Sequence, residues 1–394
     1  MANWESVELS EVCEVVRGGS PRPIIDYITD DPDGVNWLKI GDVSENDKFF
    51  THANEKIKPS GIPKTREVVK GDLILSNSMS FGRAFITLID GYIHDGWLRL
   101  RCDERRLDKE YLYYFLTSSL AQNQFKAVAT GSVVNNLKSD TVKAVRIGLP
   151  PIDVQKKISV ILARFDDKIK CNEDINKTLL EQAKALYLSW FIAFDQYGGK
   201  KPVNWVETSI NDITTLVSRG IAPKYDENSD QIVLNQKCIR NSVVDVTLGR
   251  YHRPKVINEK WLQQGDLLIN STGEGTLGRT AQVWFMPEKM TVDSHVTIVR
   301  PSRDELKYYI GLWGITHERE IEALHTGSTG QTELPRDRVK AMTLILPDSD
   351  TLKHFNAAIS PIVKMIISNQ KESKRLAELR NALLPKLMNG EIDV

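Results

Sequence analysis

The pattern of apolar and polar positions predicts one long helix near the middle of the chain. No proline or glycine occurs between Ile152 and Tyr197. Within this stretch seam positions recur every seven residues, and a second line of apolar residues lies three or four positions after most of them. Such spacing places an apolar seam along one side of a helix and is typical of a coiled coil. The first line is Ile158, Phe165, Asn172, Leu179 and Leu186, and the second is Leu162, Ile169, Ile175 and Ala183.

The same pattern returns near the C-terminus. Asn369 lies 197 positions after Asn172 and is again the polar member of its line. A polar seam residue fixes the register of a coiled coil at some cost in stability, so we predict Asn172 and Asn369 as register residues of two helices that pair within one chain. Two separate amphipathic helices, one on each domain, are the alternative. The second helix carries Phe355, Ile362, Asn369, Leu376 and Leu383, followed by Ala358, Met365 and Leu379.

The rest of the chain is a tandem duplication. The segment Trp4-Glu5-Ser6-Val7 aligns with Trp205-Val206-Glu207-Thr208. The segment Val16-Arg17-Gly18-Gly19 aligns with Val217-Ser218-Arg219-Gly220. Further along, Lys70-Gly71-Asp72 matches Gln264-Gly265-Asp266, and Thr130-Gly131-Ser132 matches Thr326-Gly327-Ser328. The order of elements is kept while loop lengths differ, so the sequence predicts two globular halves, each followed by a long helix.

Within each half, short β-like runs alternate with polar linkers, and one helical stretch follows them. This irregular mix is typical of an α+β (mixed α/β) domain rather than of a repeated strand–helix–strand fold. The predicted helical stretches are Lys109–Ala127 and Glu305–Ala323. The predicted strands are Val35–Ile40, Asp72–Ser76, Ala84–Leu88 and Val145–Leu149, then Gln231–Leu234, Asp266–Asn270, Thr280–Phe285 and Met342–Leu346.

Bulk composition narrows the class of protein. A hydrophobic fraction of 41% and a charged fraction of 26% over 394 residues are typical of a globular protein of two to three domains. No long apolar run and no signal-peptide pattern occurs, and the four cysteines are scattered, so we expect a cytoplasmic protein with reduced thiols and no membrane segment. The 52 basic and 52 acidic residues balance, which gives no support to a nonspecific nucleic-acid binder.

Patterns of catalysis and metal binding are absent from the sequence. Gly273, Gly275 and Gly278 do form a Gly-x-Gly-x-x-Gly run after a predicted strand, but another predicted strand follows instead of the helix that a dinucleotide fingerprint needs. We interpret this run as a strand connection. The seven histidines show no paired metal-ligand spacing. We therefore predict no catalytic residue, no metal site and no cofactor on this chain. Asp95 and His295 lie near each other in the repeat alignment, and we interpret each as a local structural residue.

Polar side chains recur in corresponding loops of the two halves. Arginine and lysine can bond guanine edges, asparagine and glutamine can pair with adenine, and serine and threonine suit phosphate oxygens. Such loops on a duplicated scaffold indicate a protein that binds two short DNA sequences. In the first half the predicted DNA-binding residues are Arg17, Ser20, Arg22, Asn77, Ser78, Arg83, Ser132, Asn135, Asn136 and Lys138. In the second half they are Arg219, Lys224, Asn270, Ser271, Thr272, Arg279, Ser328, Gln331, Thr332 and Arg336.

The chain resembles the specificity subunits of type I restriction–modification systems over its whole length. The resemblance is carried by the two helical segments. They include the stretch Pro150–Ile158 (PPIDVQKKI), the stretch Leu186–Phe191 (LYLSWF) and the tail Leu383–Ile392 (LLPKLMNGEI). Trp4 and Gly71-Asp72 also fit the openings and strand signals of the family's target recognition domains.

This resemblance implies two target recognition domains, each reading one half of a bipartite site in double-stranded DNA. It implies two long helices that form an antiparallel coiled coil and set the spacing. The expected partners are two modification (methyltransferase) subunits and restriction (motor-nuclease) subunits, with S-adenosylmethionine, Mg and ATP on those partners only. The chain itself would be a non-catalytic specificity subunit. The expected domains are 1–150 and 198–347 for recognition, with helical spacers at 151–197 and 348–394.

Other interpretations remain open at this point. Tyr187, Trp190 and Phe191, outside the predicted seam, form either a docking patch for partners or a surface buried against the chain's own halves. A stand-alone DNA methyltransferase and a two-headed protein-binding coiled-coil scaffold are the alternative functions. The lack of a cofactor loop and of a methyltransferase catalytic motif counts against the first of these.

Overall fold

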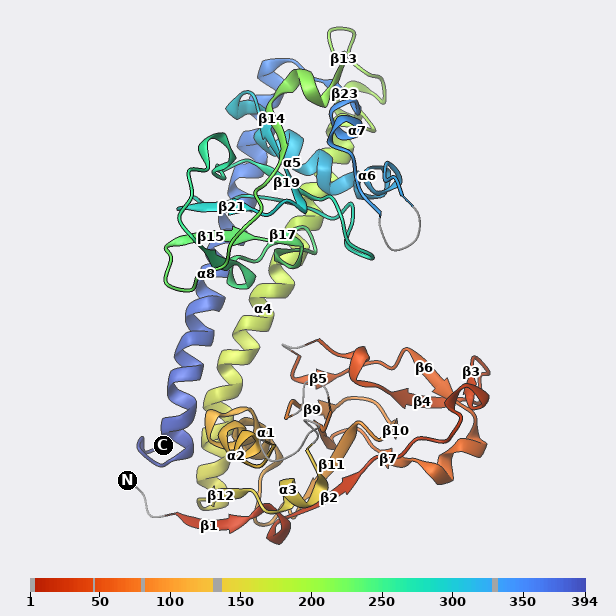
Figure 1. Cartoon of the computed structure of the whole chain (residues 1–394), viewed down its shortest axis with the longest axis vertical. Helices are drawn as coiled ribbons and strands as arrows, with labels where there is room; N and C mark the ends of the chain where they lie inside the picture. Colours follow the sequence, from red (N-terminus) through yellow and green to blue (C-terminus); the bar gives the residue numbers. More distant parts are fainter. Residues whose placement is uncertain (1–3, 45–46, 79–81, 130–136, 328–331) are drawn as a thin grey trace. The chain divides into compact units, whose positions relative to one another are not determined.

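The computed structural model describes residues 4–44, 47–78, 82–129, 137–327 and 332–394 (Figure 1). The chain folds into two compact units. Unit 1 comprises Met1–Lys170 and Ser373–Val394, and unit 2 comprises Cys171–Glu372. Both boundaries fall inside the long helices α4 (Ile152–Phe191) and α8 (Ser349–Met388), each 40 residues long. Each unit therefore contains one globular half together with a part of both helices, whereas the sequence placed each helix in a segment of its own.

Unit 1 is built on two five-stranded sheets and one strand pair. The first sheet has the order β2-β11-β8-β9-β5 and the second β3-β6-β4-β10-β7, while β1 pairs antiparallel with β12. Parallel pairs (β4 with β10, β5 with β9) occur beside antiparallel ones, as expected for an α+β fold. The strands are β1 (Glu5–Glu8), β2 (Cys13–Arg17), β3 (Ile28–Thr29), β4 (Val35–Leu38), β5 (Phe49–Phe50), β6 (Glu55–Ile57), β7 (Arg66–Val68), β8 (Leu73–Ser76), β9 (Ala84–Thr87), β10 (Gly91–Ile93), β11 (Trp97–Cys102) and β12 (Arg146–Leu149).

Unit 2 repeats this plan with fewer strands. Its main sheet has the order β14-β22-β19-β20, a second sheet has the order β18-β15-β21, and two strand pairs join β13 to β23 and β16 to β17. The strand pair β13–β23 corresponds to β1–β12, which confirms the duplication. The strands are β13 (Val206–Ser209), β14 (Thr214–Arg219), β15 (Gln231–Leu234), β16 (Ile239–Arg240), β17 (Val243–Val244), β18 (Arg250–His252), β19 (Leu267–Asn270), β20 (Thr280–Gln282), β21 (Met290–Val292), β22 (Val296–Pro301) and β23 (Thr343–Leu346).

Each predicted helical stretch of the halves is interrupted once. The first consists of α1 (Lys109–Thr117) and α2 (Ser119–Ala129), and the break is at Ser118, whose hydroxyl donates to the Phe115 carbonyl at 2.6 Å. The second consists of a 3-10 turn, α5 (Lys307–Thr316) and α6 (Glu318–Ala323), with His317 at the break. A side chain that bonds nearby backbone competes with the helical pattern, which explains why apolar periodicity alone did not predict these breaks. Two short helices, α3 (Ser139–Lys143) and α7 (Arg336–Lys340), precede the last strands.

The two halves share an aspartate–arginine ion pair at matched positions, and the pair is more deeply buried in unit 2. In unit 2, Arg300 donates to both carboxylate oxygens of Asp266 at 2.8 Å, and the two side chains are 11% and 1% exposed. In unit 1, Arg101 donates to both oxygens of Asp72 at 2.9 and 2.7 Å, but this arginine is 38% exposed. Burial raises the pKa of Asp266, and the Arg300 hydrogen bonds and charge oppose that effect. The Gly-Asp signal that matched in the sequence thus marks a structural pair in each half.

The two long helices run antiparallel within each unit. In unit 1, Ile158 and Leu162 of α4 share a core with Leu384, Leu387 and Met388 of α8. Unit 2 has the corresponding arrangement, in which α4 residues from Leu180 to Phe191 share a core with α8 residues from Leu352 to Ile366. The predicted pairing of the helices within one chain is therefore confirmed.

The seam does not follow the predicted seven-residue spacing throughout. Ile175, Met365 and Leu379 were assigned to the second line, and that prediction is wrong, because they are 39, 53 and 44% exposed. A helix with 3.6 residues per turn drifts by about 20° per heptad relative to a strict repeat. Beyond Asn172 the buried α4 residues are Leu180, Ala183, Tyr187 and Phe191. Ala183 is a predicted seam residue, whereas Leu180 and Tyr187 lie one residue after the predicted Leu179 and Leu186.

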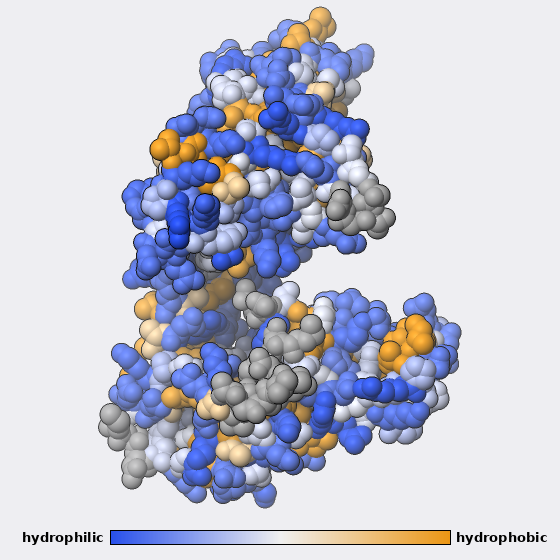
Figure 2. Space-filling view, viewed as in Figure 1, coloured by the Kyte–Doolittle hydropathy of each residue, from blue (hydrophilic) through white to orange (hydrophobic). Residues whose placement is uncertain are grey.

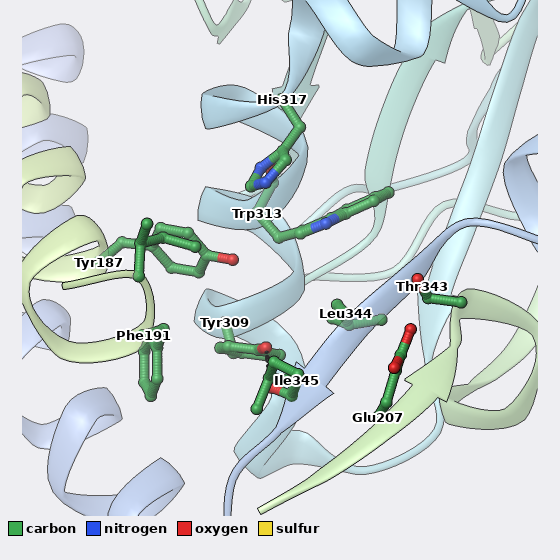
Figure 3. Close-up of a pocket in the computed structure, with 10 residues that line it drawn as sticks. Tyr187, Phe191, Glu207, Tyr309, Trp313, His317, Thr343, Leu344 and Ile345 are labelled. Carbon is green, nitrogen blue, oxygen red and sulfur yellow. Dashed lines mark hydrogen bonds between the residues drawn. The ribbon is translucent and has the colours of Figure 1, made fainter. Parts of the chain in front are cut away.

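The aromatic end of α4 is buried in unit 2 rather than offered as a docking patch. Tyr187 and Phe191 are 1 and 2% exposed. The Phe191 ring lies 4.7 Å from that of Phe355 and 4.8 Å from that of Tyr309, measured between centroids. Beside them is a cavity of about 220 Å³ whose wall includes Trp313 and His317 (Figure 3). Burial against the chain's own half is therefore the correct alternative for Tyr187 and Phe191.

Candidate nucleic-acid interface

Four of the predicted DNA-binding residues of unit 1 meet at Asp95. Ser20 donates from its hydroxyl to Asp95 Oδ1 at 2.8 Å, and Arg22 Nη2 donates to Oδ2 at 3.2 Å. The Asp95 backbone carbonyl accepts from Arg17 Nε at 3.1 Å and from Asn77 Nδ2 at 2.9 Å. These residues come from the end of β2, the following loop and the segment after β8, so the fold gathers loops that are far apart in the sequence. We call this group the Asp95 cluster.

The Asp95 cluster places a carboxylate beside the His94 imidazole, and the pKa of each group is lowered. Partial burial tends to raise the pKa of Asp95, but the Ser20 hydrogen bond together with the charges of His94 and Arg22 places it below its usual value. Burial lowers the pKa of His94, although the neighbouring Asp95 and Asp42 carboxylates oppose this effect. The negative charge of Asp95 is therefore kept at neutral pH and is balanced by arginines.

Unit 2 gathers a different set of side chains at the corresponding place. Thr272 Oγ1 lies 2.8 Å from His295 Nδ1, and Gln236 Nε2 donates to Thr272 Oγ1 at 2.8 Å. Arg219 forms an ion pair with Glu333 at 2.6 Å and donates to the Leu334 carbonyl at 2.9 Å. We call this group the His295 cluster. It presents histidine, glutamine and threonine where unit 1 presents aspartate and serine.

The same backbone bonds support both clusters. Asn77 N donates to the Gly96 carbonyl and Ser271 N to the His295 carbonyl, at 2.9 and 2.8 Å. The carbonyls of Asn77 and Ser271 in turn accept from Leu137 N and Leu334 N, at 2.7 and 2.8 Å. The two halves thus hold one scaffold with different side chains on it.

Strand register corrects the sequence alignment of the arginines by one position. Arg17 lies opposite Leu98 and Arg219 opposite Thr297. Gly18 N and Gly220 N, the next residues, donate to the carbonyls of Trp97 and Val296. Arg17 and Arg219 are therefore equivalent, and counting five residues on makes Arg22 equivalent to Lys224.

Three predicted DNA-binding residues are buried instead of exposed. Asn77 is 3% exposed, and Asn270 and Ser271 are fully buried. The Asn270 amide donates to the Gln236 carbonyl at 3.2 Å, and the Ser271 hydroxyl lies 2.6 Å from that of Thr297. Their polar groups support the loops from inside, so we remove them from the set of proposed DNA contacts.

The other predicted residues differ in exposure, and five of them lie outside the described part. Arg83 is half-buried, donates to the Ser44 carbonyl at 2.6 Å and lies over the Phe85 ring. Lys138, Lys224 and Arg336 are exposed, whereas Ser78, Thr272, Arg279 and Thr332 are half-buried. Ser132, Asn135, Asn136, Ser328 and Gln331 lie outside the described residues.

The organising role of Asp95 was not predicted from the sequence, and neither were the contacts of Gln236 and Glu333. The repeat alignment did bring Asp95 and His295 together, which was the available signal. In the structure the exact equivalent of Asp95 is Ser294, because Gly96 and His295 accept the matched backbone bonds. The carboxylate is therefore specific to unit 1.

The glycine run of unit 2 joins two antiparallel strands, as interpreted from the sequence. It connects β19 to β20, and Leu268 lies opposite Ala281. Gly273, Gly275 and Gly278 all have positive φ, which glycine adopts without strain. Gly82 in unit 1 has the same conformation as Gly278, with φ values of 81 and 82°. No helix follows the run, so it lacks the geometry of a dinucleotide-binding turn.

Neither a metal-ligand group nor a membrane span is found in the part of the chain that the structure describes. No group of three or more His, Cys, Asp or Glu side chains there could hold a metal ion. No described helix is long and apolar enough to cross a membrane. The face shown in Figure 2 is largely hydrophilic, with apolar residues in small separate groups.

This chain is similar to proteins of a known family. Residues 1–181 match the family model of the type I restriction modification DNA specificity domain. A type I restriction enzyme MjaIX specificity subunit from Methanocaldococcus jannaschii is 25% identical, and the alignment covers 100% of this chain and 94% of that protein. The chain is similar to type I specificity subunits over its whole length. The HindI specificity subunit of Haemophilus influenzae is 22% identical over 91% of this chain and 94% of its own length.

A solved specificity subunit has the same fold. The crystal structure of the type I restriction–modification S subunit from M. genitalium gives a TM-score of 0.53 at 15% identity and covers 98% of this chain and 96% of that one. The two-domain α+β fold with long helices therefore agrees with the expectation from the helical segments and the tail.

Proposed function

We propose that this chain is the DNA sequence-recognition component of a type I restriction–modification complex. Each globular half reads one half of a bipartite site, and the chain performs no catalysis itself. The observation that carries this proposal is the pair of clusters at equivalent places. The same backbone bonds hold Asp95, Ser20 and Arg22 in unit 1, and Thr272 and His295 in unit 2. A shared scaffold with different polar side chains is what independent readers of two DNA sequences need.

The net charge bears on how the complex would bind DNA. Phosphate contacts dominate nucleic-acid affinity, and this chain has equal numbers of basic and acidic residues. We therefore assign much of the phosphate binding to partners, namely two modification subunits, and to restriction subunits where they are present. S-adenosylmethionine, Mg and ATP would be bound by those partners.

The long helices provide the spacing in this proposal. Each has 40 residues, or about 60 Å at about 1.5 Å per residue. That length is comparable with the separation of half-sites one to two DNA turns apart, at about 34 Å per turn. Residues of α4 and α8 outside the seam, such as Val160 and Leu188, which are 50 and 44% exposed, are available to the modification subunits.

The proposal is tested by expressing the chain together with its modification subunit and mapping methylated bases across a host genome. We expect one motif made of two specific half-sites separated by a fixed number of unspecified bases. The purified chain alone should transfer no methyl group from S-adenosylmethionine. Methylation without sequence preference, or methyl transfer by the isolated chain, would contradict the proposal.

A further inference from the structure

Arg22 offers its guanidinium at the surface of unit 1 while Asp95 holds one end of it. The Arg22 side chain is 80% exposed, and Nη2 lies 3.2 Å from Asp95 Oδ2. Among the residues that the structure describes, Asp95 is its side-chain partner. The loop beneath is fixed, because Gly19 N donates to the Ile93 carbonyl at 3.2 Å and a Cβ at Gly19 would lie 2.4 Å from the Lys64 carbonyl oxygen. The guanidinium is therefore anchored at one nitrogen and accessible at the others.

Asp95 keeps acceptor capacity at the same surface. Its side chain is 38% exposed, with Ser20 on one oxygen and Arg22 on the other. An ionised carboxylate has about four lone-pair positions, so each oxygen can accept a further bond. A fork of N–H donors and an acceptor thus lie side by side.

This arrangement matches the major-groove edge of a G·C pair. Guanine presents two acceptors, N7 and O6, and cytosine presents the N4 amino donor. An A·T pair would place the adenine N6 donor before the arginine and the thymine O4 acceptor before the carboxylate. A phosphate is a poorer match, because it would face the negative charge of Asp95 and does not need an oriented fork.

We propose that Arg22 and Asp95 together read one G·C base pair, with Arg22 donating to guanine N7 and O6 and Asp95 accepting from cytosine N4. This inference rests on the proposed function and names one base pair that unit 1 recognises. Asp95 has a second role as a positioning residue, because its bond to Nη2 orients the guanidinium before DNA binds.

Unit 2 lacks this pair at the equivalent place. Lys224 stands where Arg22 stands, each after a proline, and Ser294 replaces Asp95. A lysine ammonium is a point charge without the planar fork that binds guanine at two atoms. The two half-sites therefore differ here, and the G·C pair belongs to the half read by unit 1.

The test combines protein and DNA substitutions. The complex of this chain with its modification subunit is titrated with labelled duplexes that carry its methylation motif, in which each base pair is replaced in turn. For the unchanged protein, replacing one G·C pair by A·T should weaken binding roughly 5- to 150-fold. Arg22→Ala should weaken binding to the intact site and remove the penalty at that pair, leaving the penalties at all other pairs unchanged.

Three further variants separate the roles. Arg22→Lys keeps the charge but loses the fork, so it should also lose discrimination at that pair while retaining more affinity than Arg22→Ala. Asp95→Asn should reduce the penalty at the same pair. Lys224→Ala, the matched change in the other half, should leave that penalty intact. Thermal unfolding checks that each variant is folded. If Arg22→Ala does not fold, the loss of discrimination is measured with Arg22→Lys instead.

Two kinds of result would overturn the inference. One is an Arg22→Ala variant whose penalties remain unchanged at every base pair, as expected for a phosphate contact or a plain surface ion pair. The other is an Arg22→Ala variant that removes the penalty at an A·T pair, or at pairs in both half-sites. A wild-type complex that binds no sequence preferentially would contradict the proposed function instead.

Discussion

The side-chain amide of Asn172 on α4 donates a 2.8 Å hydrogen bond to the carboxylate of Glu372 on α8. Four residues further along α4, Asn176 accepts from the Asn369 amide at 2.9 Å. The two predicted register residues thus belong to neighbouring bonds across the helix pair of unit 2, and each is bonded to the helix opposite. Asn172 is fully buried, so its bond fixes which residues of α4 and α8 face each other.

Replacing both Asn172 and Asn369 by leucine should raise thermal stability and loosen the register. Buried apolar side chains pack without the desolvation cost of an amide, but they accept several alignments of the helices. We expect a higher midpoint of thermal unfolding and methylation spread over more than one spacer length. The single Asn369→Leu variant serves as a control with a smaller effect. A lower midpoint in the double variant would contradict this role.

Lengthening the helix pair should change the spacing that the protein accepts. Seven residues inserted after Lys170 and seven after Glu372 add close to two turns to both helices, so their seam is kept. The recognition domains would move apart by about 10 Å, or about three base pairs, while the DNA rotates by roughly 100° over that distance. We expect methylation of the original site to be lost. A site lengthened by three base pairs should be methylated weakly, because the domains would have to twist to reach it.

Genome-wide mapping of methylated bases measures both outcomes. Insertion into α4 alone should abolish activity, because it breaks the pairing of the helices. Unchanged methylation at the original spacing by the doubly lengthened protein would show that the helices do not set it.

The matched ion pairs of the two halves should differ in their contribution to stability. Asp266→Asn leaves Arg300 unpaired in a site where it is 11% exposed, and breaking a buried pair typically costs about 3–5 kcal/mol. Asp72→Asn should cost less, because Arg101 is 38% exposed and regains water. Urea unfolding followed by tryptophan fluorescence compares the two variants. An equal or larger loss from Asp72→Asn would contradict the difference in burial.

Acidification should destabilise unit 1 through His94. Burial lowers the pKa of His94 below 6.5, and the positive charge of Lys39 lowers it further. The negative charges of Asp95 and Asp42 act in the opposite direction. The unfolded chain therefore binds this proton first as pH falls through about 6.5, and the free energy of unfolding decreases. The lowered pKa of Asp95 acts in the same direction at lower pH.

His94→Gln should reduce the loss of stability between pH 7.5 and pH 5.5, measured as the change in the urea midpoint. His52→Gln, at an exposed histidine of the same unit, is the matched control and should behave like the unchanged protein. A pH dependence that is the same in the His94→Gln variant and in wild type would refute this assignment.

Local patterns predicted the elements of the fold well, because each depends on nearby residues. Strand β15 has the predicted bounds Gln231–Leu234, and both long helices were apparent from their spacing. The seam position of Ile175 was not predictable, since it depends on which surface each turn of α4 meets. The Asp95 cluster could not be predicted either, because tertiary structure brings together Arg17, Asn77 and Asp95 from separate loops.

Exchange of one recognition domain tests the central claim most directly. Residues 1–150 are replaced by the equivalent domain of a related specificity subunit with a different motif, and methylated bases are mapped in cells that also express the modification subunit. The account predicts a hybrid motif in which one half-site changes, while the other half-site and the spacer length stay the same. A motif in which both half-sites change together would contradict independent reading by the two halves.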